Sequence, residues 1–98
     1  MRIKDLFNRR KPVLSVEVFP PKPESPLDGV ISTIEAVQDL NPDFISVTYG
    51  AGGSSRDYTV EIADRVKNKY GIETLAHLTC VGTGKDEIDD ILARLQSK

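Results

Sequence analysis

Apolar residues along this chain gather in short continuous runs, and each run is followed by a longer segment with helical spacing. Three runs rich in apolar and β-branched residues, 13–19, 44–48 and 73–79, predict short β-strands. Pro20-Pro21 ends the first strand, because proline cannot donate a ladder hydrogen bond. The leader 3–9 is long enough for a turn or two of helix, with Leu6 and Phe7 as its apolar side.

Start and stop signals bound the predicted helices. Helix one has Ser25 as N-cap, Pro26 at the first helical position and Asp28 in the first turn, and Asn41-Pro42 ends it. Helix two begins near Ser55 and ends before Gly71, which suits the left-handed position after a helix. The buried faces are expected at positions with helical spacing: Leu27, Val30, Ile31, Ile34 and Val37; Ile62, Ala63, Val66 and Tyr70; Ile88, Ile91, Leu92 and Leu95.

Three strands that each precede a helix predict an α/β fold with parallel strands joined by right-handed crossovers. The short, largely apolar strands suggest that both faces of the sheet are covered. The candidate architectures are an open doubly wound sheet and a closed (β/α)8 TIM barrel. A barrel takes about 250 residues, so residues 1–98 are interpreted as one incomplete domain, the N-terminal three βα units of a barrel.

Composition and charge exclude several classes of protein. The net charge is −2, and the three tyrosines and three phenylalanines are not interleaved with basic residues, which argues against nucleic-acid binding. The chain has no apolar run near the roughly 18 residues of a membrane span. The charged N-terminus lacks the apolar stretch of a signal peptide, and the single Cys80 rules out an internal disulfide framework. We therefore expect a protein of the reducing cytoplasm.

Glu17 is the first candidate for chemistry, because it lies near the carboxyl end of the first strand, where parallel α/β folds bind ligands. A carboxyl group buried in an apolar strand would have a raised pKa, which suits a general acid. The alternative is a glutamate at the rim of the sheet that faces water. The sequence leaves both readings open.

The second strand ends in a glycine-rich loop, 48–57, that leads into the second helix. Glycines allow a ligand close to the backbone, and a helix N-terminus favours negative charge. The spacing does not fit the dinucleotide fingerprint, since Ser55 stands where its last glycine would fall, and the loop has no lysine for a Walker A motif. Many such loops are simple turns, and a phosphate-binding barrel with an anion site at 50–55 stays open as a reading.

His77-Leu78-Thr79-Cys80 closes the third strand. Alternation places His77 and Thr79 on one side of the strand and Cys80 on the other, which disfavours a nucleophilic pair of His77 and Cys80. One histidine and one cysteine are too few ligands for a metal site. By default His77 is a structural histidine and Cys80 a small apolar residue.

Taken together, three motifs resemble the methylenetetrahydrofolate reductase family in their order and spacing. They are Ser15-Val16-Glu17-Val18-Phe19-Pro20-Pro21-Lys22, Phe44-Ile45-Ser46-Val47-Thr48-Tyr49-Gly50-Ala51 and Ala76-His77-Leu78-Thr79-Cys80. Two departures are mild: the family often has phenylalanine where Val18 stands, and some members have a more polar pair in place of Gly52-Gly53.

The resemblance implies a (β/α)8 barrel that binds FAD at its C-terminal face and passes hydride from NADH or NADPH to 5,10-methylenetetrahydrofolate. It matches Glu17 to the general acid that protonates the bridging nitrogen of the folate. It matches Thr48 to a position where nicotinamide stacks near the flavin, and Tyr49, Ala51 and His77 to positions that line FAD. It further implies a full-length homo-oligomer in methionine biosynthesis, without nucleic-acid or membrane partners.

The family's later FAD contacts and most of its folate pocket have no counterpart within these 98 residues. The chain by itself is therefore expected to be inactive. A hypothesis from a different class is a non-catalytic α/β fragment that serves as a folding or assembly module, whose exposed edges and helix faces would seek partners.

Overall fold

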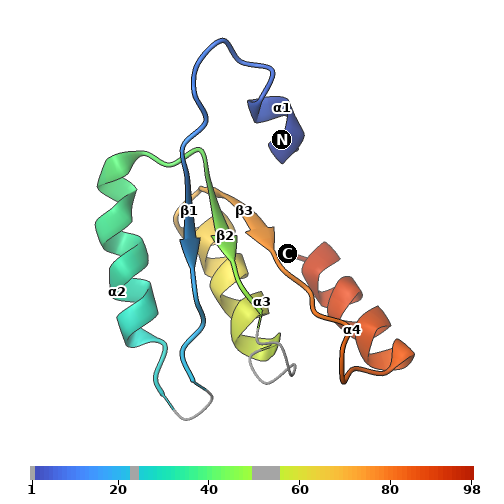
Figure 1. Cartoon of the computed structure of the whole chain (residues 1–98). Coiled ribbons are helices and arrows are strands. Elements are labelled where there is room, and N and C mark those ends of the chain that lie inside the picture. The colour runs from blue at the N-terminus through green and yellow to red at the C-terminus, as the bar shows by residue number, and fades with distance from the viewer. Residues whose placement is uncertain (1, 23–24, 50–55) are drawn as a thin grey trace.

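The computed structural model describes residues 2–22, 25–49 and 56–98, and its centre is a three-stranded parallel sheet (Figure 1). The strands are β1 (Ser15–Val18), β2 (Phe44–Val47) and β3 (Glu73–Ala76), in the order β1-β2-β3. Ser15 is in register with Phe44, and Phe44 with Glu73. The predicted strands and their parallel order are confirmed, although β1 and β3 are shorter than the apolar runs that predicted them.

Helices cover one face of this sheet. The core on that face is formed by Val18, Ile45 and Val47 from the strands and by buried residues of the two helices that follow β1 and β2. On the opposite face Glu17 and Leu75 are exposed. The expectation that both faces are covered is therefore wrong for the described residues, because the helices that follow the strands all pack on the same side (Figure 1).

Helix α2 (Asp28–Val37) places its apolar stripe on the core as predicted, with Ile34 fully buried. Its start differs from the prediction, since the N-cap is Leu27 and Ser25 lies before the helix. The Ser25 N–H donates instead to the Lys22 carbonyl at 2.8 Å. A 3-10 turn, η1 (Gln38–Leu40), continues α2 to Asn41, whose φ of 51° ends the helix where predicted.

Helix α3 (Arg56–Asp64) continues into a π-helical segment, η2 (Arg65–Lys69), that the sequence did not predict. Ile62, Ala63 and Val66 are buried against the sheet, as the helical spacing indicates. Gly71 follows with a φ of +69°, which a residue with a Cβ rarely adopts. The Tyr70 hydroxyl donates to Glu35 Oε1 of α2 at 2.8 Å, and this hydrogen bond to a carboxylate raises the pKa of Tyr70.

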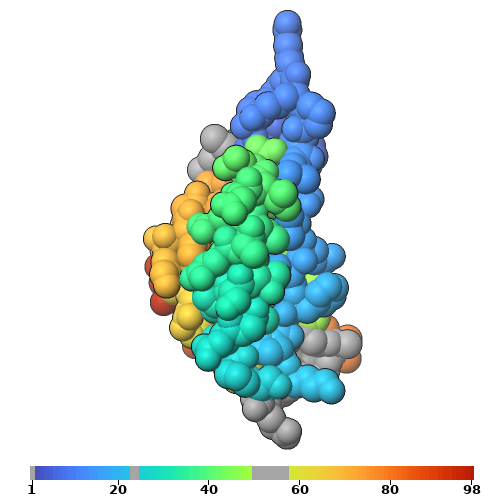
Figure 2. Space-filling model, turned by 90° about the vertical axis from the view of Figure 1, so that its left-hand side faces the viewer, coloured from blue at the N-terminus to red at the C-terminus, as the bar shows by residue number. Residues whose placement is uncertain are grey.

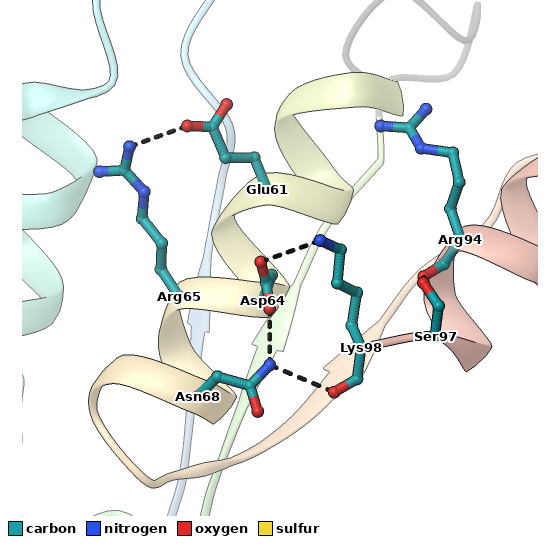
Figure 3. A network of polar contacts seen from close by, with 7 residues as sticks. All are labelled: Glu61, Asp64, Arg65, Asn68, Arg94, Ser97 and Lys98. Atoms are coloured by element: carbon teal, nitrogen blue, oxygen red, sulfur yellow. Dashed lines mark hydrogen bonds and ion pairs between the residues drawn. The ribbon is translucent and has the colours of Figure 1, made fainter.

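Helix α4 (Lys85–Gln96) packs beside α3 through Ile91, which is buried, while Leu92 on its predicted apolar face is half exposed. Polar contacts also join the two helices at the end of the chain (Figure 3). Asn68 donates to the Lys98 carbonyl at 3.2 Å and to Asp64 Oδ1 at 2.6 Å, and Lys98 Nζ lies 3.5 Å from Asp64 Oδ2. The hydrogen bond from Asn68, with the nearby Lys98 charge, lowers the pKa of Asp64.

The leader lies at the amino end of the sheet, where α1 (Ile3–Leu6) contacts β3. Leu6 is buried as predicted, but Phe7 is 62% exposed and meets Phe44 edge-on at 6.4 Å between ring centroids. Viewed from the side, α2 runs along the molecule and the blue leader extends past it at this end (Figure 2). The leader therefore lies against the amino end of the sheet, in contact with β3 and with Phe44.

This arrangement is that of consecutive βα units of a barrel whose sheet is not closed. Sequential strands are neighbours, and each helix returns the chain to the same side. Among the described residues, no helix combines the length and the apolar character that crossing a bilayer requires.

Candidate functional site

The candidate residues meet at the carboxyl edge of the sheet, on its open face. Glu17 in β1 is in register with Ser46 in β2, and paired residues of parallel strands point to the same face. His77 directly follows β3, and its backbone N–H donates to the Val47 carbonyl at 3.0 Å. Adjacent strands thus bring together Glu17, Ser46 and His77, which are far apart in sequence.

The side chains of these three residues form a small polar cluster. Ser46 Oγ lies 2.8 Å from His77 Nε2, a hydrogen-bond distance, whereas Glu17 Oε1 lies 3.8 Å from the same nitrogen. The side chains of His77 and Glu17 are 43% and 49% exposed. Both groups are therefore accessible from the open face.

The exposure of Glu17 bears on the two readings that the sequence left open, a buried general acid and a rim glutamate. The argument for a buried general acid required desolvation of the carboxyl group, and in this chain half of the side chain is exposed. Glu17 is a glutamate at the rim of the sheet, and burial in an apolar strand is wrong for the described residues. An acid role for Glu17 needs a ligand or further chain to cover it.

Thr48 and Tyr49 follow β2 in a backbone held from two sides. The Thr48 N–H donates to the Val18 carbonyl at 3.0 Å, and the hydroxyl of Thr59 in α3 donates to the Thr48 carbonyl at 2.9 Å. Thr59 is 1% exposed and Tyr49 is buried. These contacts fix the direction in which the chain leaves the sheet beside Glu17 and His77.

The remaining predictions at this edge concern Ala51, the anion site at 50–55, Cys80 and a metal site. Ala51 and the predicted anion site at 50–55 lie outside the described residues. Cys80, which the sequence suggested to be a small apolar residue, is a free thiol that is exposed in this chain. The part of the chain that the structure describes holds no group of three or more metal-ligating side chains.

Comparison with known proteins assigns the chain to a family. Residues 2–98 match the family model described as methylenetetrahydrofolate reductase. The chain belongs to the methylenetetrahydrofolate reductase family. The resemblance noted in its three motifs is confirmed.

Plant and bacterial relatives agree with this assignment. The chain is 41% identical over 96 residues to a probable methylenetetrahydrofolate reductase (NADH) of Oryza sativa, a match of 98% of this chain and 16% of the relative. It is 35% identical over 96 residues to methylenetetrahydrofolate reductase (NADH) 1 of Arabidopsis thaliana, with the same coverage. It is 37% identical over 78 residues to the 5,10-methylenetetrahydrofolate reductase of Escherichia coli, a match of 80% of this chain and 26% of the relative. The chain thus spans 16–26% of the length of these relatives.

Ser46, which the structure places at the centre of the cluster, was not among the candidate residues that the sequence suggested. Only the strand register could have indicated Ser46. Once β1 and β2 are aligned, Ser46 pairs with Glu17 and lies on the same face of the sheet. Serine in a family motif rich in valine and threonine gives no separate chemical signal.

The residues present are compatible with the flavin that this reductase family implies. The carboxyl edge presents hydrogen-bonding groups of different kinds, a carboxylate, a hydroxyl and an imidazole, on an exposed face. A flat ring system with polar edges can approach such a face without displacing the apolar core, which lies on the other side of the sheet.

Proposed function

We propose that the protein to which these units belong reduces 5,10-methylenetetrahydrofolate to 5-methyltetrahydrofolate, with FAD as cofactor and NADH or NADPH as hydride donor. The observation that carries the proposal is the cluster of Glu17, Ser46 and His77 on the open face at the carboxyl edge, in a chain that matches the reductase family over residues 2–98. This edge is where barrel enzymes hold their active sites.

Glu17 is the proposed general acid. From its rim position the carboxyl group can deliver a proton to the bridging nitrogen of a folate that lies on the open face, so that the five-membered ring opens to an iminium ion. The bound folate and cofactor would exclude water from a side chain that is half exposed in this chain. Exclusion of water favours the protonated carboxyl group, which the donor role needs.

Thr48, Tyr49, Ala51 and His77 are the proposed flavin-binding residues. Thr48 directly follows β2 and His77 directly follows β3. The hydrogen bond from the Thr59 hydroxyl to the Thr48 carbonyl holds the Thr48 backbone in place. FAD, when bound, supplies hydride transfer between the nicotinamide nucleotide and the folate. The protein orients the reactants and controls the proton.

Several further properties belong to this proposal. The names of the plant relatives specify NADH, and we propose that one of the two nicotinamide nucleotides serves here as well. We propose a cytoplasmic homo-oligomer whose chemistry supplies methyl groups for methionine synthesis. The 98 residues alone should neither bind FAD tightly nor turn over, because they cover only 16–26% of the relatives.

The test is a flavin titration of this chain beside a version extended through the rest of the barrel. FAD absorbance and fluorescence report binding, and the oxidation of NADH or NADPH with 5,10-methylenetetrahydrofolate reports turnover. The proposal predicts flavin binding and turnover by the extended protein and neither by the 98-residue chain.

An extended protein that binds no flavin would contradict the proposal. A folded 98-residue chain that self-associates, beside an extended protein without turnover, would instead favour the folding or assembly module. The observation behind that alternative is the open sheet face, on which Leu75 is 38% exposed.

A further inference from the structure

Ser46 is the hydrogen-bond partner of Nε2, the ring nitrogen of His77 that faces Glu17, the proposed general acid. Its Oγ lies 2.8 Å from Nε2, and Glu17 Oε1 lies 3.8 Å from that nitrogen. A hydroxyl can donate or accept, so it satisfies Nε2 in either tautomer of the imidazole. The carboxylate is beyond hydrogen-bond distance, which makes Ser46 the direct partner.

The backbone holds Ser46 and Glu17 in positions from which both can compete for Nε2 of His77. The strand register fixes Ser46 beside Glu17. The hydrogen bond from the backbone N–H of His77 to the Val47 carbonyl fixes the start of the segment after β3. A small rotation of the imidazole is then enough to exchange one partner of Nε2 for the other. Without the hydroxyl of Ser46, Glu17 would be the nearest remaining partner among these three residues.

We propose that Ser46 is a positioning residue that takes the hydrogen bond of His77 Nε2 and so keeps the Glu17 carboxyl group free of a direct hydrogen bond to the imidazole. A direct hydrogen bond from the imidazole to Glu17 would stabilise the carboxylate and oppose the protonated form. A general acid needs that protonated form available for its substrate. The meaning for catalysis rests on the proposed function, whereas the competition for Nε2 does not.

His77 is the only histidine in the chain, so its ring signals can be assigned without ambiguity. We would label the 98-residue chain with ¹⁵N and record long-range ¹H–¹⁵N spectra of the imidazole at about pH 8, where imidazole is ordinarily neutral. The variants are Ser46→Ala, Ser46→Thr, Glu17→Gln and the double variant Ser46→Ala/Glu17→Gln. Backbone amide spectra of each variant check that the sheet is retained.

In the chain with Ser46, Glu17→Gln should barely move the Nε2 signal. In the Ser46→Ala background the same change should move it clearly more, because the hydrogen bond that competes with Glu17 for Nε2 is gone. Ser46→Thr keeps the hydroxyl and should behave as the parent chain does. Equal responses to Glu17→Gln with and without the hydroxyl would overturn the proposal.

A second arm uses the extended reductase. Ser46→Ala should slow folate reduction while leaving the reduction of flavin by the nicotinamide nucleotide within about twofold, and Ser46→Thr should restore the folate rate. If Glu17→Gln moves the Nε2 signal more in the Ser46→Ala background, but neither the extended parent protein nor its variants reduce folate, the reductase function is rejected and the positioning role is kept. Normal folate rates in Ser46→Ala would reject the positioning role in catalysis.

Discussion

The two faces of the sheet differ in what their side chains contribute. On the covered face Val18, Ile45 and Val47 pack against α2 and α3, and Ile45 and Val47 are fully buried. On the open face Glu17, Ser46 and Leu75 are in register with one another, and they remain partly or largely accessible. Alternation along the same strands therefore separates stability from chemistry, since each position serves one face only.

The difference shows how a reactive site can be held in place without being buried. The covered face fixes the strand register, and the register sets the spacing of Glu17, Ser46 and His77. Changes on the covered face should therefore act on folding, and changes on the open face should act on chemistry.

The largest expected change in stability is for Ile45→Ala on the covered face. Removing this fully buried side chain should lower the free energy of unfolding by about 2–5 kcal/mol, because it loses apolar burial and leaves a cavity. Leu75→Ala on the open face is the matched control and should cost about 1 kcal/mol or less, because that side chain is already 38% exposed.

Urea denaturation followed by circular dichroism measures both values. If the two variants lose the same stability, the open face is packed in solution, and the contrast between the faces fails.

A smaller effect is expected from Asp43, at the amino end of the sheet. Asp43 accepts hydrogen bonds from the Leu14 N–H at 2.9 Å and from Arg9 at 2.6 Å, and these contacts lower its pKa from the ordinary 3.8. Its stabilising contribution is therefore present above pH 3.8 and is lost as the pH falls through the lowered value.

Asp43→Asn should lower stability at neutral pH and weaken its dependence on pH below 3.8. Unfolding midpoints from pH 7 down to about pH 2 would show this. Asp89→Asn on exposed α4 is the control. A steep loss of stability in acid that persists unchanged in Asp43→Asn would rule out Asp43 as its source.

The smallest effect is expected from the ion pair of Glu61 and Arg65 on the outer surface of α3 and η2. Their side chains are 45% and 41% exposed, with Arg65 donating to Glu61 Oε1 at 2.8 Å (Figure 3). Glu61→Gln should cost about 0.3–0.5 kcal/mol at low salt and less at high salt. A cost that exceeds that of Leu75→Ala would reverse the order expected here.

Sequence patterns predicted the covered face well, because burial against helices imposes periodicity. Ile34, Ile62 and Val66 are buried as their spacing indicated. The ends of elements were predicted less well. The run that predicted the third strand continues through Leu78, yet β3 ends at Ala76. Ser25 and Pro26 suggested a helix start, but α2 begins only at Asp28, with Leu27 as its N-cap.

The candidate site was predicted in part. The motifs placed Glu17 and His77 at one edge of the sheet, and the structure brings them to 3.8 Å. Ser46 could not be found from its residue type, because its role depends on the register between β1 and β2 and on the ring orientation of His77. The exposure of Glu17 depends on which chain segments cover the open face, and local sequence does not encode that.

The account rests most on Glu17 as a proton donor on the open face, and Glu17→Gln in the extended protein tests this directly. The two halves of the reaction are measured separately by stopped flow, with flavin absorbance as the signal. We expect the flavin to be reduced by NADH or NADPH at the parent rate, within about twofold, and folate reduction to fall by about 10²–10⁴-fold. Folate reduction at the parent rate in Glu17→Gln would contradict the account.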